Sequence, residues 1–191
     1  MSTVAISGLV MKMTVFDVIR ERGSIRQYTP AAIPERDLQT ILEAARLAQS
    51  AANRQPWEFI LVTDPAVKAG LVEAAHRPDR PPQSSVSTAA AVLVCLADPA
   101  ASRPVGPFSG FLIDLAIAIE NMALTAWELG IGSCWIGAFQ EDPVKVLLGV
   151  PAHLRVVSLL TLGYPDEEPR PKNRKTLAEI LHYQRYGQRT P

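Results

Sequence analysis

Two arginines and a serine lie close together near the N-terminus, in the segment Arg22-Gly23-Ser24-Ile25-Arg26. A guanidinium is a planar fork of donors that suits a phosphate dianion, and a neighbouring hydroxyl adds one more hydrogen bond. We expect Arg22 and Ser24 to bind such an anion. Arg26, two residues further along an extended loop, would reach the polar edge of a heterocycle. On composition alone, a solvated basic turn is the favoured alternative.

Three further segments could take part in binding. The loop from Gln49 to Trp57 holds small and amide residues and runs into a strand-like apolar run, although serine and asparagine also favour turns for purely local reasons. Lys172 and Arg174 lie on a proline- and charge-rich arm, where the alternative is a solvated tail. The glycine-rich segment 130–137 is not a dinucleotide fingerprint, because Trp135 replaces the third glycine and a helix precedes it.

The elements that must position these residues follow from caps and apolar periodicity. Helices are predicted from Thr14, from Pro34, from Asp64 to Ala75, over Phe111–Leu129, from Asp142 to Gly149 and, briefly, after Thr176. Strands are predicted at 58–63 (buried), 89–97, 133–139 and 155–162, with loops at 77–87 and 99–110. The irregular crossovers favour a mixed α+β sandwich over a doubly wound sheet. We expect a flexible leader over residues 1–12 and a single domain over 13–191.

The helix predicted over Phe111–Leu129 is apolar on most sides. Its polar side chains fall on one face, and its alanines are small enough for close helix contact: Asp114, Asn121, Thr125 and Glu128, and Ala116, Ala118, Ala123 and Ala126. A helix of this kind must be buried on most sides, which a single small domain can hardly achieve. The sequence therefore predicts a homodimer.

Bulk composition excludes several classes of function. Lys plus Arg and Asp plus Glu both number 19 in 191 residues, so no basic field favours nucleic acid. Charged residues interrupt the longest apolar stretch, which fits a buried helix better than a membrane span. The scattered histidines and two cysteines have no metal-site spacing. Cys95 and Cys134 lie in apolar runs and favour a reducing, cytoplasmic location.

These motifs, in this order, resemble the nitroreductase family of FMN enzymes. The resemblance rests on Arg-x-Ser-x-Arg at 22–26, on the 49–57 loop, on Gly163-Tyr164-Pro165 and on Pro171-Lys172-Asn173-Arg174. It extends from about Thr14 to Gly187. It implies a nitroreductase-like α+β fold in which helices sandwich a small mixed or antiparallel sheet, and a homodimer that exchanges its C-terminal arm.

The resemblance also implies roles for individual residues. FMN would be held by Arg22, Gly23, Ser24 and Arg26, and Lys172 and Arg174 would complete the phosphate site. Ile136 and Gly137 would be backbone donors near flavin N5. The partner chain would contribute Gln49, Ser50, Ala51 and Asn53. The chain departs from the family pattern at Gly23, where a bulkier basic residue is common. It also departs at Gln49 and Ala51, where Pro and Ser are frequent, and at Ile136, where Glu is common. At the last three positions the expected contacts are mainly through backbone atoms.

The implied activity is a ping-pong oxidoreductase reaction in which NADH or NADPH reduces the flavin and a nitroaromatic, quinone or related acceptor reoxidises it. The flavin carries the chemistry, so no catalytic side chain is expected. A flavin destructase or dehalogenase of the same fold is one alternative, disfavoured by the short 77–87 and 99–110 loops. A non-catalytic FMN-binding or storage protein and a flavin-free dimeric domain are the others.

Overall fold

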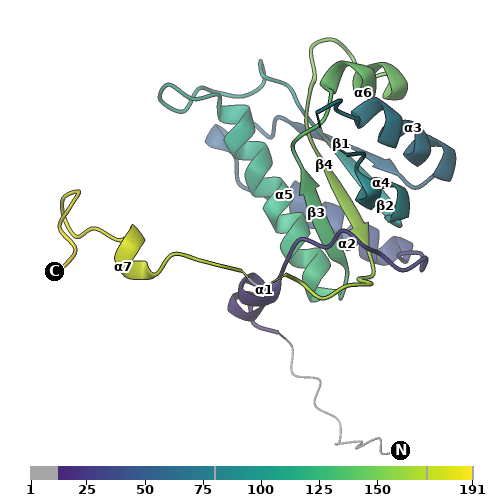
Figure 1. The fold of residues 1–191 in the computed structure, drawn as a ribbon. Coiled ribbons are helices and arrows are strands. Elements are labelled where there is room, and N and C mark those ends of the chain that lie inside the picture. The colour runs from purple at the N-terminus through teal and green to yellow at the C-terminus, as the bar shows by residue number, and fades with distance from the viewer. Residues whose placement is uncertain (1–12, 80, 171, 191) are drawn as a thin grey trace, which may run out of the picture.

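The computed structural model describes residues 13–79, 81–170 and 172–190, so the leader predicted over residues 1–12 lies outside the described residues. Its centre is a four-stranded sheet of β1 (Trp57–Val62), β2 (Ala91–Ala97), β3 (Gly132–Ile136) and β4 (Arg155–Gly163), in the spatial order β1-β2-β4-β3. All three strand pairs are antiparallel. The small antiparallel form of the predicted sheet is therefore confirmed (Figure 1).

The strands differ in burial according to their place in the sheet. All seven residues of the central strand β2 are buried, which matches its continuous apolar run. The strand predicted at 58–63 is present as β1, but its predicted burial is wrong, because β1 lies at an edge and exposes Glu58 and Leu61. Trp57 and Phe59 are half-buried on the face that the long helix covers.

Helices cover both faces of the sheet (Figure 1). One face carries α2 (Glu35–Arg46) and α5 (Gly110–Glu128), and the other carries α3 (Pro65–Ala75), α4 (Ser84–Thr88) and α6 (Glu141–Leu148). Two separate apolar clusters, one on each face, form the core. The short α1 (Val15–Glu21) contacts α5, and a 3₁₀ turn, η1 (Ala51–Asn53), follows α2. This two-sided arrangement confirms the predicted α+β sandwich.

Local capping explains where several helices begin. Thr14 and Asp17 form the predicted capping box of α1, and the Asp64 carboxylate accepts hydrogen bonds from Ala66 N and Val67 N at the start of α3. The loop predicted at 77–87 is wrong at its end, where Ser84–Thr88 forms the helix α4. Ser87 and Thr88 donate their hydroxyls to the Ser84 carbonyl, so serine and threonine side chains here bond within a helical turn.

The long helix α5 is a core element. By length and composition it could cross a membrane, but half of that stretch is buried inside the protein. Its alanines at 118, 123 and 126 are buried within their own chain, and Ala118 and Ala126 belong to the core cluster on this face of the sheet. Asp114, predicted on the polar face, is also buried. The large apolar residues that α5 exposes are Leu112 and Ile113.

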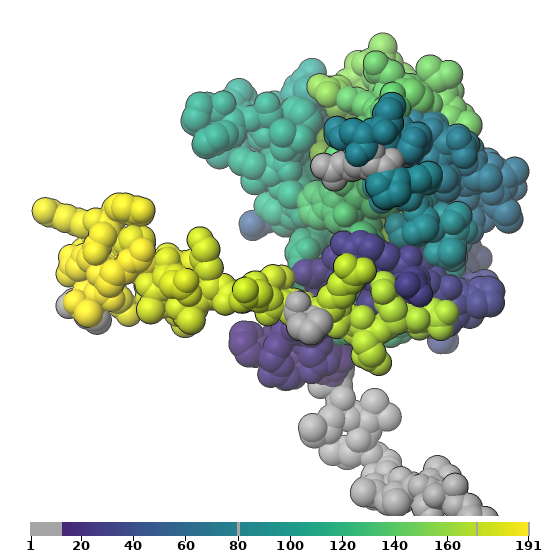
Figure 2. All heavy atoms as spheres, in the orientation of Figure 1, coloured from purple at the N-terminus to yellow at the C-terminus, as the bar shows by residue number. Residues whose placement is uncertain are grey.

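The C-terminal arm projects from the body and carries the short helix α7 (Leu177–Ile180) away from it (Figure 2). Thr176 and Glu179 form the predicted capping box of this helix. Leu177, Ile180 and Leu181 are exposed on it. Within the described part of the chain, this short helix therefore leaves apolar side chains uncovered.

Candidate functional site

A small cavity lined mainly by cationic side chains lies where the Arg22 loop meets the C-terminal arm. We call it the cation cradle. Its volume is about 270 Å³, and it is lined by Arg22, Gly23, Ser24, Arg26, Arg170, Lys172, Asn173 and Arg174. Five of these eight residues are basic and none is acidic. The structure thus brings together six of the residues expected to hold the cofactor, from segments about 150 positions apart.

Backbone pairing fixes the arm against the loop. Thr29 N donates to the Tyr164 carbonyl at 2.9 Å, and Asp166 N donates to the Gln27 carbonyl at 3.0 Å. The Glu167 carboxylate accepts hydrogen bonds from Arg26 N and Gln27 N. These hydrogen bonds position the residues after Pro169 beside the Arg22 loop.

Gly23 has a steric role at this crossing. A Cβ at this position would lie 2.6 Å from Pro169 Cβ, closer than real Cβ atoms approach one another. Any larger residue would push the arm away from the loop. The glycine that departs from the family pattern therefore lets the arm pass close to the loop.

The same loop lies beside strand β3, along the line that leads to Ile136 and Gly137. Ser24 pairs with Ser133 in a parallel bridge, and Ile25 N donates to the Ser133 carbonyl at 2.9 Å. Because the two segments run in the same direction, residues 24–26 lead from the cradle toward the end of β3. Tyr28 secures the loop, since its hydroxyl donates to the Ile25 carbonyl at 2.6 Å and bonds to Thr161 Oγ1.

The charges and the unpaired donor of the cradle favour a bound anion. Burial lowers the pKa of the Lys172 ammonium, and the neighbouring Arg22 and Arg174 guanidiniums lower it further. Arg22 Nε is buried and has no hydrogen-bond partner, although Glu120 Oε1 lies 3.5 Å away. It costs free energy to hold like charges together and to bury a donor without an acceptor. A bound anion would remove both costs.

The Gln49–Asn53 segment does not line the cradle of its own chain. It lies against the first part of α5, where Ala51 N donates to Asp114 Oδ1 at 2.9 Å. Asp114 and Glu120, which reaches Arg22, are six residues apart and so point about 120° apart around the helix. Within one chain, the Gln49–Asn53 segment and the Arg22 loop therefore contact α5 at different parts of its surface.

Three residues of this site were missed in the sequence. Arg170 and Asn173 line the cradle but stand in an arm of alternating charge, where nothing distinguishes a ligand-facing side chain from a solvated one. Asp114 was placed on the polar face of the helix, and no role was assigned to it. The signal that could have found it is a lone carboxylate early in an otherwise apolar helix.

Comparisons with known proteins agree with this arrangement. A family model described as the nitroreductase family matches residues 19–164, about three quarters of the chain. The chain belongs to the nitroreductase family. A candidate NADH dehydrogenase/NAD(P)H nitroreductase of Archaeoglobus fulgidus is 41% identical over 155 residues, covering 79% of this chain and 85% of that protein. A NADPH-flavin oxidoreductase of Vibrio harveyi is 28% identical, covering 92% and 75%.

A solved structure shows the same fold. The nitroreductase family protein of Clostridium novyi NT superimposes with a TM-score of 0.77 at 34% identity, covering 92% of this chain and 96% of that one. Membership of the nitroreductase family makes this chain an oxidoreductase of that type and implies a flavin cofactor. The cradle fits such a group, because it offers a buried unpaired donor and clustered cations to an anion. Lys172 and Arg174 lie beyond the matched residues, so their assignment rests on the cradle itself.

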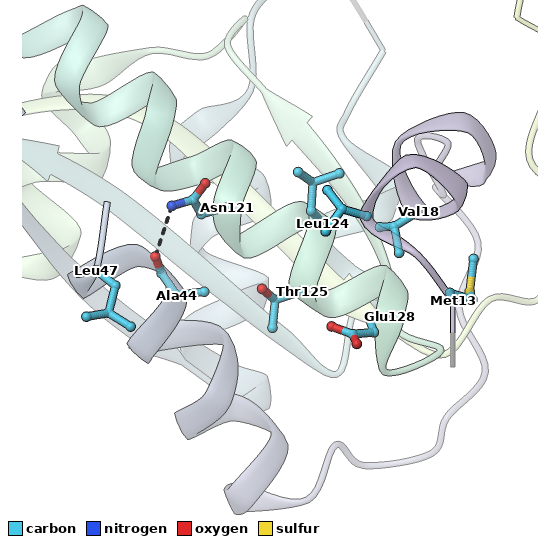
Figure 3. A pocket seen from close by; sticks show the side chains of 9 residues that line it. Met13, Val18, Ala44, Leu47, Asn121, Leu124, Thr125 and Glu128 are labelled. Atoms are coloured by element: carbon cyan, nitrogen blue, oxygen red, sulfur yellow. Dashed lines mark hydrogen bonds between the residues drawn. The ribbon is translucent and has the colours of Figure 1, made fainter. Parts of the chain in front are cut away.

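The nitroreductase chain also carries an open groove between α1, α2 and α5 (Figure 3). Its volume is about 310 Å³, and Val18, Leu47 and Leu124 contribute to an apolar lining. Asn121 Nδ2 donates to the Ala44 carbonyl at 3.2 Å and holds α5 to α2 beside it. Beside the groove, α1 exposes Phe16.

Both thiols are unsuited to nucleophilic chemistry. Complete burial raises the pKa of the Cys95 thiol to about 12, and burial also raises the pKa of Cys134. Among the described residues, no cluster of three or more His, Cys, Asp or Glu could hold a metal ion.

Proposed function

We propose that this chain is an FMN-dependent oxidoreductase that uses NADH or NADPH to reduce nitroaromatic, quinone or related acceptors. The observation that carries the proposal is the cation cradle, in which five basic side chains and no carboxylate surround one small cavity. The names of the similar proteins from Archaeoglobus fulgidus and Vibrio harveyi support the nicotinamide donor.

The charge of the cradle favours FMN over FAD. The terminal phosphate of FMN is a monoester with a charge of about −1.5 to −2 at neutral pH. Each phosphate of FAD bears two ester or anhydride links and carries a single negative charge. Arg22, Lys172 and Arg174 together suit the more highly charged group, because clustered cations are stabilised most by a dianion.

The loop along β3 supports an assignment for the flavin ring. With the phosphate in the cradle, Arg26 would face the pyrimidine edge, and the backbone N–H groups of Ile136 and Gly137 would donate near N5. These residues would hold a flavin there, which would supply the chemistry of taking a hydride from the nicotinamide and passing reducing equivalents to the acceptor. Fixed N–H groups and a guanidinium stabilise negative charge that develops at the ring edge. No side-chain acid is needed for hydride transfer, which depends mainly on alignment.

We further propose a homodimer in which each flavin site draws on both chains. The Gln49–Asn53 segment does not line the cradle of its own chain, and in a dimer it would be available to that of a second copy. The groove between α1, α2 and α5 and the exposed residues Phe16 and Leu47 offer a surface for that copy. The arm with α7 offers unburied leucines that a partner would cover.

Steady-state kinetics test this function. If donor and acceptor use the same flavin face in turn, initial rates at several fixed nicotinamide concentrations give parallel double-reciprocal lines. Intersecting lines would contradict the ping-pong mechanism. Anaerobic addition of NADH and of NADPH separates the alternatives. A storage protein would bind flavin without reduction, whereas a destructase would consume the reduced flavin once oxygen is readmitted as the oxidant.

A further inference from the structure

Asp114 stands apart from the other buried polar residues. Among the described residues, the buried polar side chains are four hydroxyl groups and this one carboxylate, which is only 2% exposed. A buried carboxylate is costly unless hydrogen bonds satisfy it. Its contacts therefore show what the fold uses it for.

The carboxylate joins two loops that are far apart in the sequence. Oδ1 accepts a hydrogen bond from Ala51 N at 2.9 Å, and Oδ2 accepts one from Ser102 Oγ at 3.2 Å. The first contact reaches the loop that follows α2, and the second reaches the base of the 99–110 loop. Both loops are thus tied to the first two turns of α5.

The loop held through Ala51 has an unfavourable backbone. Ala52, Asn53 and Gln55 have φ values of 52°, 54° and 49°, in the left-handed region that disfavours residues with a Cβ. Such strain persists only where the surroundings over-determine it, and it gathers at binding and catalytic sites. Here the restraints include the Asp114 bond, a bond from Gln55 N to Ser50 Oγ at 2.9 Å, and backbone bonds from Asn53 N to the Ser50 carbonyl and from Arg54 N to the Ala51 carbonyl.

The other loop is packed tightly at the same point. A Cβ at Gly110 would lie 1.8 Å from the Arg103 carbonyl oxygen and 2.8 Å from Ser102 Oγ. The absence of a side chain at Gly110 lets the 102–103 backbone rest on the start of α5. That contact brings the Ser102 hydroxyl to the carboxylate.

We propose that Asp114 is a positioning residue that holds the 50–55 loop in its strained conformation through one oxygen and anchors the 99–110 loop through the other. The role of the loop in facing flavin rests on the function proposed above, but the restraint itself does not. Removal of the carboxylate should release the strained backbone. In holoenzyme the released loop would then lose contact with the cofactor of the neighbouring chain.

Arg54 supplies a direct readout, because it lies exposed in the middle of the strained loop. We expect trypsin to cleave the Arg54–Gln55 bond of the flavin-free dimer at least about tenfold faster in Asp114→Ala than in wild type, since cleavage follows the open population. Asp114→Asn should fall between them, because its amide oxygen can still accept from Ala51 N. Ser102→Ala should leave Arg54 protected and raise amide exchange only in the 99–110 loop.

Asp64→Ala is the matched control, since Asp64 also accepts two hydrogen bonds, from Ala66 N and Val67 N at the start of α3. It should lower the urea midpoint, because α3 loses its N-cap, without exposing Arg54. Light scattering ensures that the variants compared share one oligomeric state. Equal cleavage at Arg54 in Asp114→Ala, or in Asp114→Asn if the alanine variant does not fold, and in Asp64→Ala would overturn the proposal.

Flavin binding separates this inference from the proposed function. In Asp114→Ala we expect a weaker FMN affinity and an altered visible circular dichroism of the bound flavin, with partial recovery in Asp114→Asn. If wild type binds no flavin but the cleavage pattern holds, the proposed function fails and the loop restraint stands. If wild type binds FMN and Asp114→Ala binds it with an unchanged spectrum, the positioning role is refuted.

Discussion

Arg22→Ala is the substitution that tests the cation cradle most sharply. The Arg22 side chain is 23% exposed, so its charge is only partly screened by solvent. A hydrogen bond to a charged group contributes about 1.5–3 kcal/mol. Removal of Arg22 also leaves the Glu120 carboxylate, which lies 3.5 Å from Arg22 Nε behind the cavity lining, without that cation, which adds repulsion toward a phosphate. We therefore expect a loss of about 2–3 kcal/mol, or roughly a 30- to 150-fold rise in the Kd for FMN.

The assay is a fluorescence titration of flavin-free protein with FMN at several salt concentrations. Arg20→Ala is the matched control, because Arg20 lies two residues earlier with 58% of its side chain exposed and pairs with Asp17 at 2.7 Å. An exposed pair of this kind contributes about 0–1 kcal/mol to folding and nothing to the cradle, so the Kd should stay within about twofold.

A double variant adds a second check. If repulsion from Glu120 contributes to the loss, Arg22→Ala combined with Glu120→Gln should bind FMN several-fold more tightly than Arg22→Ala alone, an order-of-magnitude expectation for one like-charge contact. Salt should weaken wild-type binding more than binding by Arg22→Ala. The reasoning is refuted if Arg22→Ala behaves like Arg20→Ala, or if both proteins show the same salt dependence.

Three further predictions concern ionisation, thiols and assembly. The pKa of Lys172 is lowered in the flavin-free site, and a bound phosphate would raise it again, so FMN affinity should fall as pH rises through the lowered pKa. Lys172→Arg should abolish that fall, since arginine stays charged; the same pH profile in both proteins would contradict it. Cys95 and Cys134 should resist iodoacetamide at pH 8 in the native protein and react after unfolding; rapid labelling of the native protein would show that the thiols are accessible. The variant Cys134→Ala should keep substantial turnover. Leu47→Asp, in the groove beside α1, should give monomers by light scattering, whereas Val146→Asp on α6 should not; a wild-type monomer that binds FMN would contradict the dimer.

The fold could be predicted largely because its elements carry local signals. The capping box at Thr14 and Asp17 and the apolar run of β2 each determine an element within a few residues. The helix α4 was missed because Ser84–Thr88 is made of residues that favour turns unless their hydroxyls bond back within a helix. That choice depends on burial of Val86 against the core, which no local pattern reveals.

The site was predictable in its residues but not in its geometry. The basic residues at 22–26 and at 172–174 could be identified by their resemblance to a family. Their proximity in space depends on long-range backbone hydrogen bonds, such as the one from Thr29 N to the Tyr164 carbonyl. Helical periodicity placed Asp114 on a polar face correctly. It could not show that the neighbour on that face is the Ala51 N–H group rather than water.

The central claim is that the cradle holds the phosphate of FMN, and the flavin released from purified protein tests it most directly. Denaturation followed by chromatographic identification and quantitation against protein concentration should give FMN, at about one per chain for a non-covalent cofactor with one cradle. Release of FAD, or no flavin after reconstitution with FMN, would contradict the account.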